Sequence, residues 1–146
     1  MTKPTTTLNE LIEITRDGQT FYSEAVNQVD NPHLKTVFRG IIDAKSQLIS
    51  ALSEHVRVYG EKPSADGTFA GSFRKLYAEI SARLSDHKDA TIVAQLEESE
   101  DRLLHAFEHA AKDSDDLALH QIIAEHLPKV RLCHEQMRNL KMLLAA

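Results

Sequence analysis

The sequence is poor in the residues that support nucleophilic or nucleotide-dependent chemistry. It has one cysteine, no tryptophan, five glycines and four prolines among 146 residues. The single thiol, Cys133, cannot form a disulfide within the chain, which is typical of a protein from a reducing compartment. The glycines form no phosphate-binding loop, and no serine, histidine and aspartate pattern of a hydrolase is present. We therefore expect no catalysis of these kinds.

Long apolar runs and clusters of basic residues are also missing. No uninterrupted apolar run approaches the ~20 residues that cross a bilayer, and residues 1–4 lack the apolar core of a secretory signal. The net charge is -5, and the 17 Lys and Arg residues form no stripe that could neutralise a row of phosphates. We expect a cytoplasmic protein that binds neither membrane nor nucleic acid.

The sequence contains four long segments with helical periodicity. Apolar residues recur at spacings of three and four, and no segment alternates as a strand does. Thr7 and Glu10 have the form of a capping box, so the first helix is predicted to begin at Thr7. The other predicted helices cover residues 32–59, 89–112 and 117 to near the C-terminus. The chain is therefore predicted to be a single all-α domain over residues 1–146, with residues 1–6 flexible.

The lengths of the connections predict how these helices are arranged. The first and last links are short, which makes their flanking helices antiparallel neighbours, whereas residues 61–86 form a long connection. That connection carries apolar residues from Phe69 to Leu84 at helical spacing, so we expect an additional short crossover helix that covers the wide apolar face of residues 32–59. Such a crossover lets the second and third helices run parallel, the topology of a ferritin-like four-helix bundle.

Two carboxylates interrupt an apolar stripe in the third predicted helix. Glu97 and Glu100 lie between Val93 and Leu104 on one face, where a buried partner is required. Counting equal distances from the link near Asp113 places Glu100 level with His126, and Glu97 level with Arg131. These groups are therefore expected near the middle of the bundle.

A ferritin-like bundle holds two metal ions at this height, bound by a Glu from each of two helices and a Glu-x-x-His unit from each of the others. The second predicted helix offers Asp43 followed by Ser46 and Gln47, an acid without its histidine, and the fourth offers His134 with Arg131 in place of its acid. A guanidinium cannot bind a metal, so Arg131 is expected to form a salt bridge with Glu97 or Glu100.

Three interpretations of these polar residues stay open: an intact two-metal site, a reduced metal site, and a structural polar network, which we favour. The candidate metal ligands are Glu97, Glu100, His126 and His134. His55 is interpreted as a core or boundary residue, and the pair His105 and His109 as solvated histidines. No cofactor is expected on the favoured interpretation, and iron or another divalent metal is the ligand on the alternative one.

Several short stretches together resemble a known bacterial family. They are Leu8 to Gly18 with Phe21 and Tyr22, Pro32 to Lys35 with Phe38, Gly67 to Gly71 with Arg74, and Glu97 to Asp101. In these residues the chain resembles the ferritin-like four-helix-bundle proteins of the domain-of-unknown-function family 2383. The resemblance implies the fold, while more distant ferritin-like relatives linked to stress responses keep fuller sets of metal ligands.

The function expected from the sequence is therefore non-enzymatic. We expect a structural or stress-associated interaction protein, acting as a homodimer and carrying a degenerate metal site. The alternative is an iron- or manganese-binding protein with a reduced carboxylate and histidine site.

Overall fold

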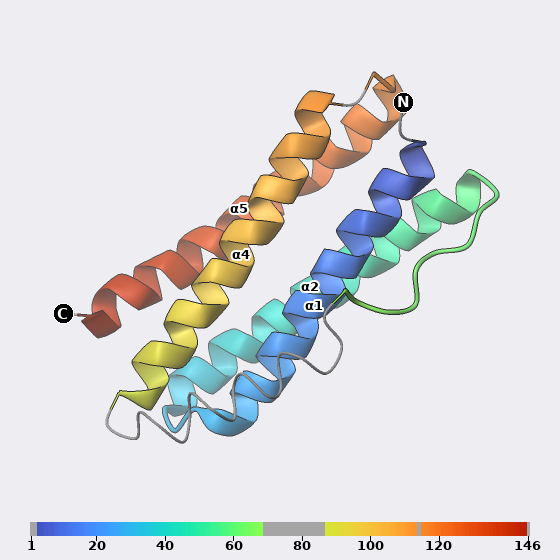
Figure 1. Cartoon of the computed structure of the whole chain (residues 1–146). Coiled ribbons are helices and arrows are strands. Elements are labelled where there is room, and N and C mark those ends of the chain that lie inside the picture. The colour runs from blue at the N-terminus through green and yellow to red at the C-terminus, as the bar shows by residue number, and fades with distance from the viewer. Residues whose placement is uncertain (1–2, 69–86, 114, 146) are drawn as a thin grey trace.

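The computed structural model describes residues 3–68, 87–113 and 115–145. Its helices are α1 (Pro4–Gln28), α2 (Pro32–Val58), α4 (Lys88–Asp113) and α5 (Leu117–Ala145), coloured from blue to red in Figure 1. No strand occurs in these ranges, so the predicted all-α class is confirmed. The additional short helix predicted from Phe69 to Leu84 lies outside the described residues.

Side-chain caps fix the starts of two helices where the sequence predicts them. Asn31 Oδ1 accepts hydrogen bonds from the backbone N–H groups of His33 at 2.8 Å and Leu34 at 3.4 Å. Asp116 Oδ1 accepts from the backbone N–H of Leu119 at 2.9 Å. Each cap satisfies N–H groups that have no partner within the first helical turn.

The start of α1 differs from the prediction. The helix begins at Pro4, with Lys3 as its N-cap and no side-chain capping bond, so the predicted start at Thr7 is wrong. Proline is well suited to the first helical position because its fixed φ is helical and its missing N–H would be unpaired there in any case.

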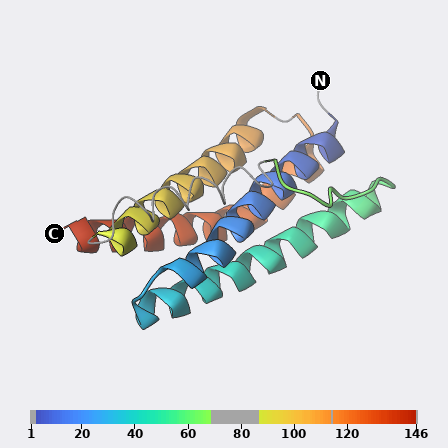
Figure 2. The same ribbon diagram turned by 60° about the horizontal axis from the view of Figure 1, so that its bottom comes forward.

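The helices form two antiparallel hairpins, α1 with α2 and α4 with α5, which meet along α1 and α4. Figures 1 and 2 show the two hairpins side by side. Asp89, in the first turn of α4, accepts hydrogen bonds from the backbone N–H groups of Asp30 and Asn31, each at 3.2 Å. Because the starts of α2 and α4 lie together, the two helices run in the same direction. The pair α2 and α5 makes the least contact of the neighbouring pairs.

The first part of the long connection is tied down along α1. The backbone N–H of Ser64 donates to Asn9 Oδ1 at 2.8 Å, and its hydroxyl donates to Glu13 Oε2 at 2.6 Å. The backbone N–H of Thr68 donates to Asp17 Oδ1 at 2.7 Å, and its hydroxyl donates to the other oxygen of that carboxylate. A polar stripe on α1 at helical spacing therefore holds the chain as it leaves α2.

The buried side chains divide into two apolar clusters along the length of the bundle. One cluster includes Leu8, Leu11, Ile12, Ile49, Leu52, Val56, Leu103, Phe107 and Ile123. The other includes Phe21, Tyr22, Ala25, Leu34, Phe38, Ile92, Leu96 and Met137. Buried Lys45 and Glu100 lie between these two sets of positions on α2 and α4, so a polar layer separates the two halves of the core.

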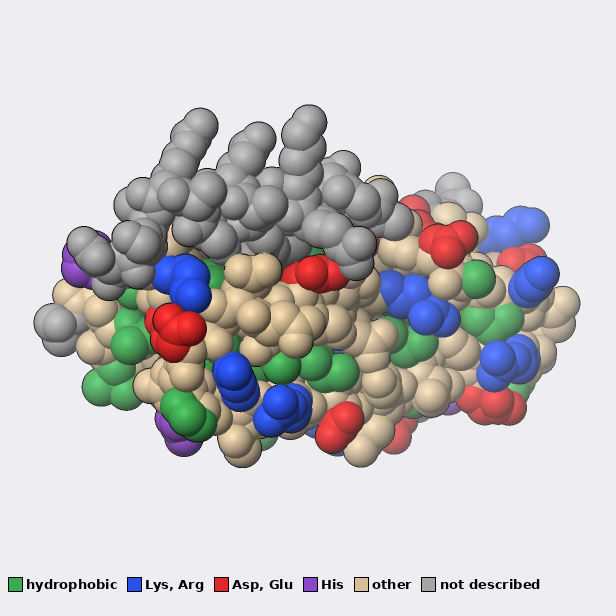
Figure 3. Space-filling model, turned by 90° about the horizontal axis from the view of Figure 1, so that it is seen from below, with side chains coloured by type: hydrophobic (Ala, Val, Ile, Leu, Met, Phe, Trp, Pro, Cys, Tyr) green, Lys and Arg blue, Asp and Glu red, His purple; other side chains and the backbone are tan. Residues whose placement is uncertain are grey.

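None of the described helices is both long and apolar enough to cross a membrane. On the face drawn in Figure 3, acidic and basic side chains are interspersed among apolar ones. This face therefore has charged side chains of both signs.

Candidate functional site

The polar layer is built around an ion pair between α2 and α4. Lys45 Nζ lies 2.8 Å from Glu100 Oε1, and the two side chains are only 4% and 1% exposed. The hydroxyl of Tyr22 donates to the same oxygen at 2.8 Å, and Lys45 Nζ also lies 5.6 Å from the centre of the Tyr22 ring. One oxygen of the acid that the sequence places inside an apolar stripe is therefore paired with a cation and a phenol.

A glycine on α1 makes room for this lysine. A Cβ atom at Gly18 would lie 3.1 Å from Lys45 Cε, a tighter contact than most Cβ atoms make, and 3.4 Å from its Cδ and Nζ. The group that approaches Gly18 closely is the Lys45 side chain. The sequence does contain one indication that Lys45 is buried: the residue lies one turn from both Ile41 and Ile49, in a buried row of α2.

An open groove between α2 and α5 reaches this ion pair from outside. It encloses about 200 Å³, and its lining includes Lys45 and Glu100, with Leu48 on α2 and Cys133 on α5. Glu100 Oε2 is buried and has no hydrogen-bond partner within the described part of the chain. Burial raises the pKa of the Cys133 thiol, the Glu100 carboxylate raises it further, and Lys45 opposes the shift. Cys133 is thus a thiol whose charge state depends on both members of the pair.

The predicted salt bridge of Arg131 with Glu97 or Glu100 is wrong. Arg131 instead approaches Glu108, with 3.6 Å between Nη2 and Oε2 at a largely exposed position. Glu97 lies opposite His134, its Oε1 3.6 Å from Nε2. The count from Asp113 failed because α4 continues through that residue and α5 begins at Leu117, which moves the matching positions on α5 toward the C-terminus.

The structure divides the four predicted metal ligands among three places. Glu100 is paired with Lys45. His134 lies near Glu97 and 3.3 Å from Asp101 Oδ1, although its Nε2 has no hydrogen bond of good geometry among the described residues. His126 lines the same groove as Glu100, but its ligand atom lies with those of His55 and Glu125. The four residues therefore do not form one set.

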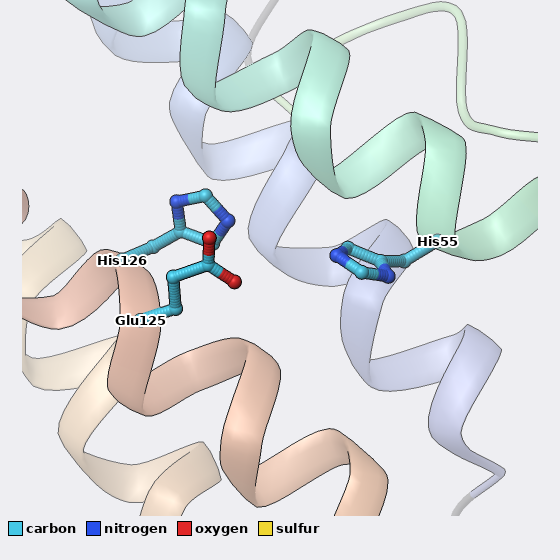
Figure 4. A group of neighbouring side chains, drawn as sticks. All are labelled: His55, Glu125 and His126. Carbon is cyan, nitrogen blue, oxygen red and sulfur yellow. The ribbon is translucent and has the colours of Figure 1, made fainter.

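His126 belongs instead to a cluster that spans α5 and α2. The ligand atoms of His55, Glu125 and His126 lie within 4.8 Å of one another, and Figure 4 shows the three side chains directed into the space between the two helices. Burial lowers the pKa of the His126 imidazole, Glu125 opposes this shift, and Lys129 and His55 add to it. The sequence does not indicate this cluster, because Glu125 occupies an exposed position of α5 and no local pattern places His55 across from it.

The histidines of α4 are solvated, as expected. His105 Nδ1 lies 3.3 Å from Asp101 Oδ2, and His109 Nε2 lies 2.9 Å from Asp113 Oδ2. Both imidazoles are mostly exposed, and each carboxylate is one helical turn away on the same helix. These are i, i+4 pairs at the surface, of a kind that is common on helices.

The comparison with known families identifies one match. The family described as Domain of unknown function (DUF2383) matches residues 3–113, a segment that includes Tyr22, Lys45 and Glu100 and ends with α4. No curated protein and no solved structure matches the sequence.

Proposed function

Because the chain belongs to the family Domain of unknown function (DUF2383), whose name assigns no activity, we propose a function from the centre of the bundle. The protein is a non-enzymatic, ferritin-like bundle that acts by binding another protein chain, and it has replaced a metal centre with a structural ion pair. The ferritin-like class is supported by α2 and α4, which run in the same direction and so require one long crossover.

The observation that carries this proposal is the pairing of Glu100 with Lys45. A two-metal centre needs several anionic ligands to offset the charge of the ions. Here the central carboxylate already accepts bonds from an ammonium and a phenol, and an ammonium has no lone pair to give to a metal. Asp17, the acid of α1 near this height, is bound to Thr68 of the connection. The donor set does not fit two metal ions.

Iron or manganese binding by Glu97, Glu100, His126 and His134 has weaker support, because these residues lie in three separate groups. Among the described residues, the grouping of three possible ligands that lie within 4.8 Å of one another contains His126 but none of the other three. A stress-associated role in the bacterial cytoplasm is part of the same proposal, supported by the single cysteine and the resemblance to ferritin-like proteins.

A homodimer is the form in which we propose that the protein acts. The support is the exposure of large apolar side chains on the two helices that meet least, with Val58 77%, Leu117 72% and Leu132 65% exposed. Covering such side chains with a second copy would remove apolar area from water. Light scattering should give the mass of two chains, and a monodisperse monomer would contradict this part of the proposal.

Iron titration tests the absence of a two-metal centre. The metal-free protein is titrated anaerobically with Fe²⁺ and then exposed to oxygen. We expect no binding that depends on Glu100, and iron oxidation no faster than in buffer. Binding of two ions per chain that is abolished by Glu100→Ala would refute the proposal.

A further inference from the structure

The imidazole of His126 is buried, and one of its two nitrogens lacks a hydrogen-bond partner among the described residues. The side chain is 6% exposed, and its Nε2 atom has no hydrogen-bond partner within residues 3–68, 87–113 and 115–145. Buried polar atoms are nearly always satisfied, so such an atom requires an explanation, and an ion is one of the ordinary ones. The two other residues that approach it, His55 and Glu125, are both metal-binding types.

We propose that His55, Glu125 and His126 bind a divalent transition-metal ion of the zinc class, which joins α2 to α5. Two imidazoles and one carboxylate are a known ligand set for Zn²⁺, which takes a water molecule as its fourth ligand. This proposal does not rest on the proposed function, which concerns the pairing of Glu100 with Lys45 and requires no metal, although His126 and Glu100 line the same groove.

The geometry is close to what such an ion needs. In a tetrahedral site with bonds of about 2.0–2.1 Å, ligand atoms are about 3.3 Å apart. The present separations, all within 4.8 Å, require a modest contraction. His126 is fixed by burial, whereas His55 is half-buried and Glu125 is exposed, so these two side chains can rotate toward it.

The place of the site in the fold gives the ion a role. Since α2 and α5 make the least contact of the neighbouring helix pairs, an ion bound by one residue of α2 and two of α5 fastens the open side of the bundle. An ion that binds the folded chain better than the unfolded chain raises the melting temperature. Imidazole ligands favour Zn²⁺ over Mg²⁺, so Mg²⁺ should produce no such rise.

The experiment uses the metal-free full chain and Zn²⁺ as the probe. Calorimetric titration and thermal melting are measured for the wild type, Glu125→Gln and His55→Ala. Both altered side chains reach the surface, so these variants are expected to fold. The matched control is His105→Ala with His109→Ala, which removes the exposed histidines of α4.

We expect one Zn²⁺ per chain and a raised melting temperature in the wild type and in the control. Affinity should fall at least about tenfold in Glu125→Gln and in His55→Ala, since even the loss of a group that supports a ligand costs that much. The proposal is overturned if Zn²⁺ gives no rise in melting temperature. It is also overturned if the control loses binding while Glu125→Gln keeps it, because the ion is then held by the surface histidines.

Discussion

Lys45 on α2 and Glu100 on α4 meet in the interior of the bundle, with 2.8 Å between the ammonium nitrogen and the carboxylate oxygen. The pair lies between two apolar clusters, and Tyr22 donates to the same carboxylate oxygen. Desolvation of two charges opposes much of their attraction, so a buried ion pair of this kind adds little net stability. Each residue of the pair instead depends on the other, because removal of one leaves the second charge buried and unpaired.

The reactivity of Cys133 should report the charges of this pair. Glu100 raises the pKa of the thiol and Lys45 lowers it. At pH 8, below the ordinary thiol pKa of 9.0, Glu100→Gln should therefore speed alkylation by iodoacetamide, because the thiolate is the reactive form. Lys45→Met should slow it. Since Cys133 is the chain's one cysteine, the rate of alkylation measures this site alone.

The opposite signs of the two changes are the control in this experiment. If both substitutions accelerate alkylation, the variants have opened the groove and the rate no longer reports charge. That result would contradict the electrostatic link between Cys133 and the pair.

Two glycines in helices provide a test of the packing around Lys45. Gly40 on α2 has no atom within 4 Å of an added Cβ, so Gly40→Ala should raise the free energy of unfolding by about 0.5–1 kcal/mol through helix propensity. Gly18→Ala should lose that gain, because the new methyl group pushes against a lysine held by Glu100. We expect chemical denaturation to show it at least about 1 kcal/mol less stable than Gly40→Ala. Equal stabilisation by both substitutions would show that Lys45 is free to move aside.

The attachment of the long connection to α1 should be measurable as stability. Asp17→Asn weakens the charge-assisted bonds from the backbone and hydroxyl of Thr68. We expect the free energy of unfolding to fall by about 1–2 kcal/mol. Asp43→Asn, a change at an exposed acid of α2, is the matched control and should lie within about 0.5 kcal/mol of the wild type. Similar effects of the two substitutions would mean that Asp17 does not anchor the connection.

Local signals in the sequence predict most of the fold. Prolines and capping side chains mark where α2 and α5 begin, and apolar spacing identifies all four described helices. Glu100 is recognisable as an interior acid because it interrupts an apolar stripe. These features depend on residues within a few turns of one another.

The partners across helices could not be predicted in the same way. Lysine is usually a surface residue, but its long apolar stem can also be buried. The residue type therefore does not identify Lys45 as the partner of Glu100. The register of α4 against α5 depends on where the link begins and ends, and an error of a few residues assigned Arg131 the wrong neighbour. The proximity of His55 to His126 depends on the packing of α2 against α5, which no local pattern encodes.

The coupling energy between Lys45 and Glu100 tests the central claim most directly. Chemical denaturation of Lys45→Met, Glu100→Leu and the double variant gives a complete double-mutant cycle. Each single substitution leaves a buried charge without its partner and should cost about 3–5 kcal/mol, whereas the double variant should recover much of that loss. If the double variant costs no more than either single substitution, the coupling energy is at least about 3 kcal/mol. Costs that add to within about 0.5 kcal/mol would contradict the claim that a structural ion pair occupies the centre of the bundle.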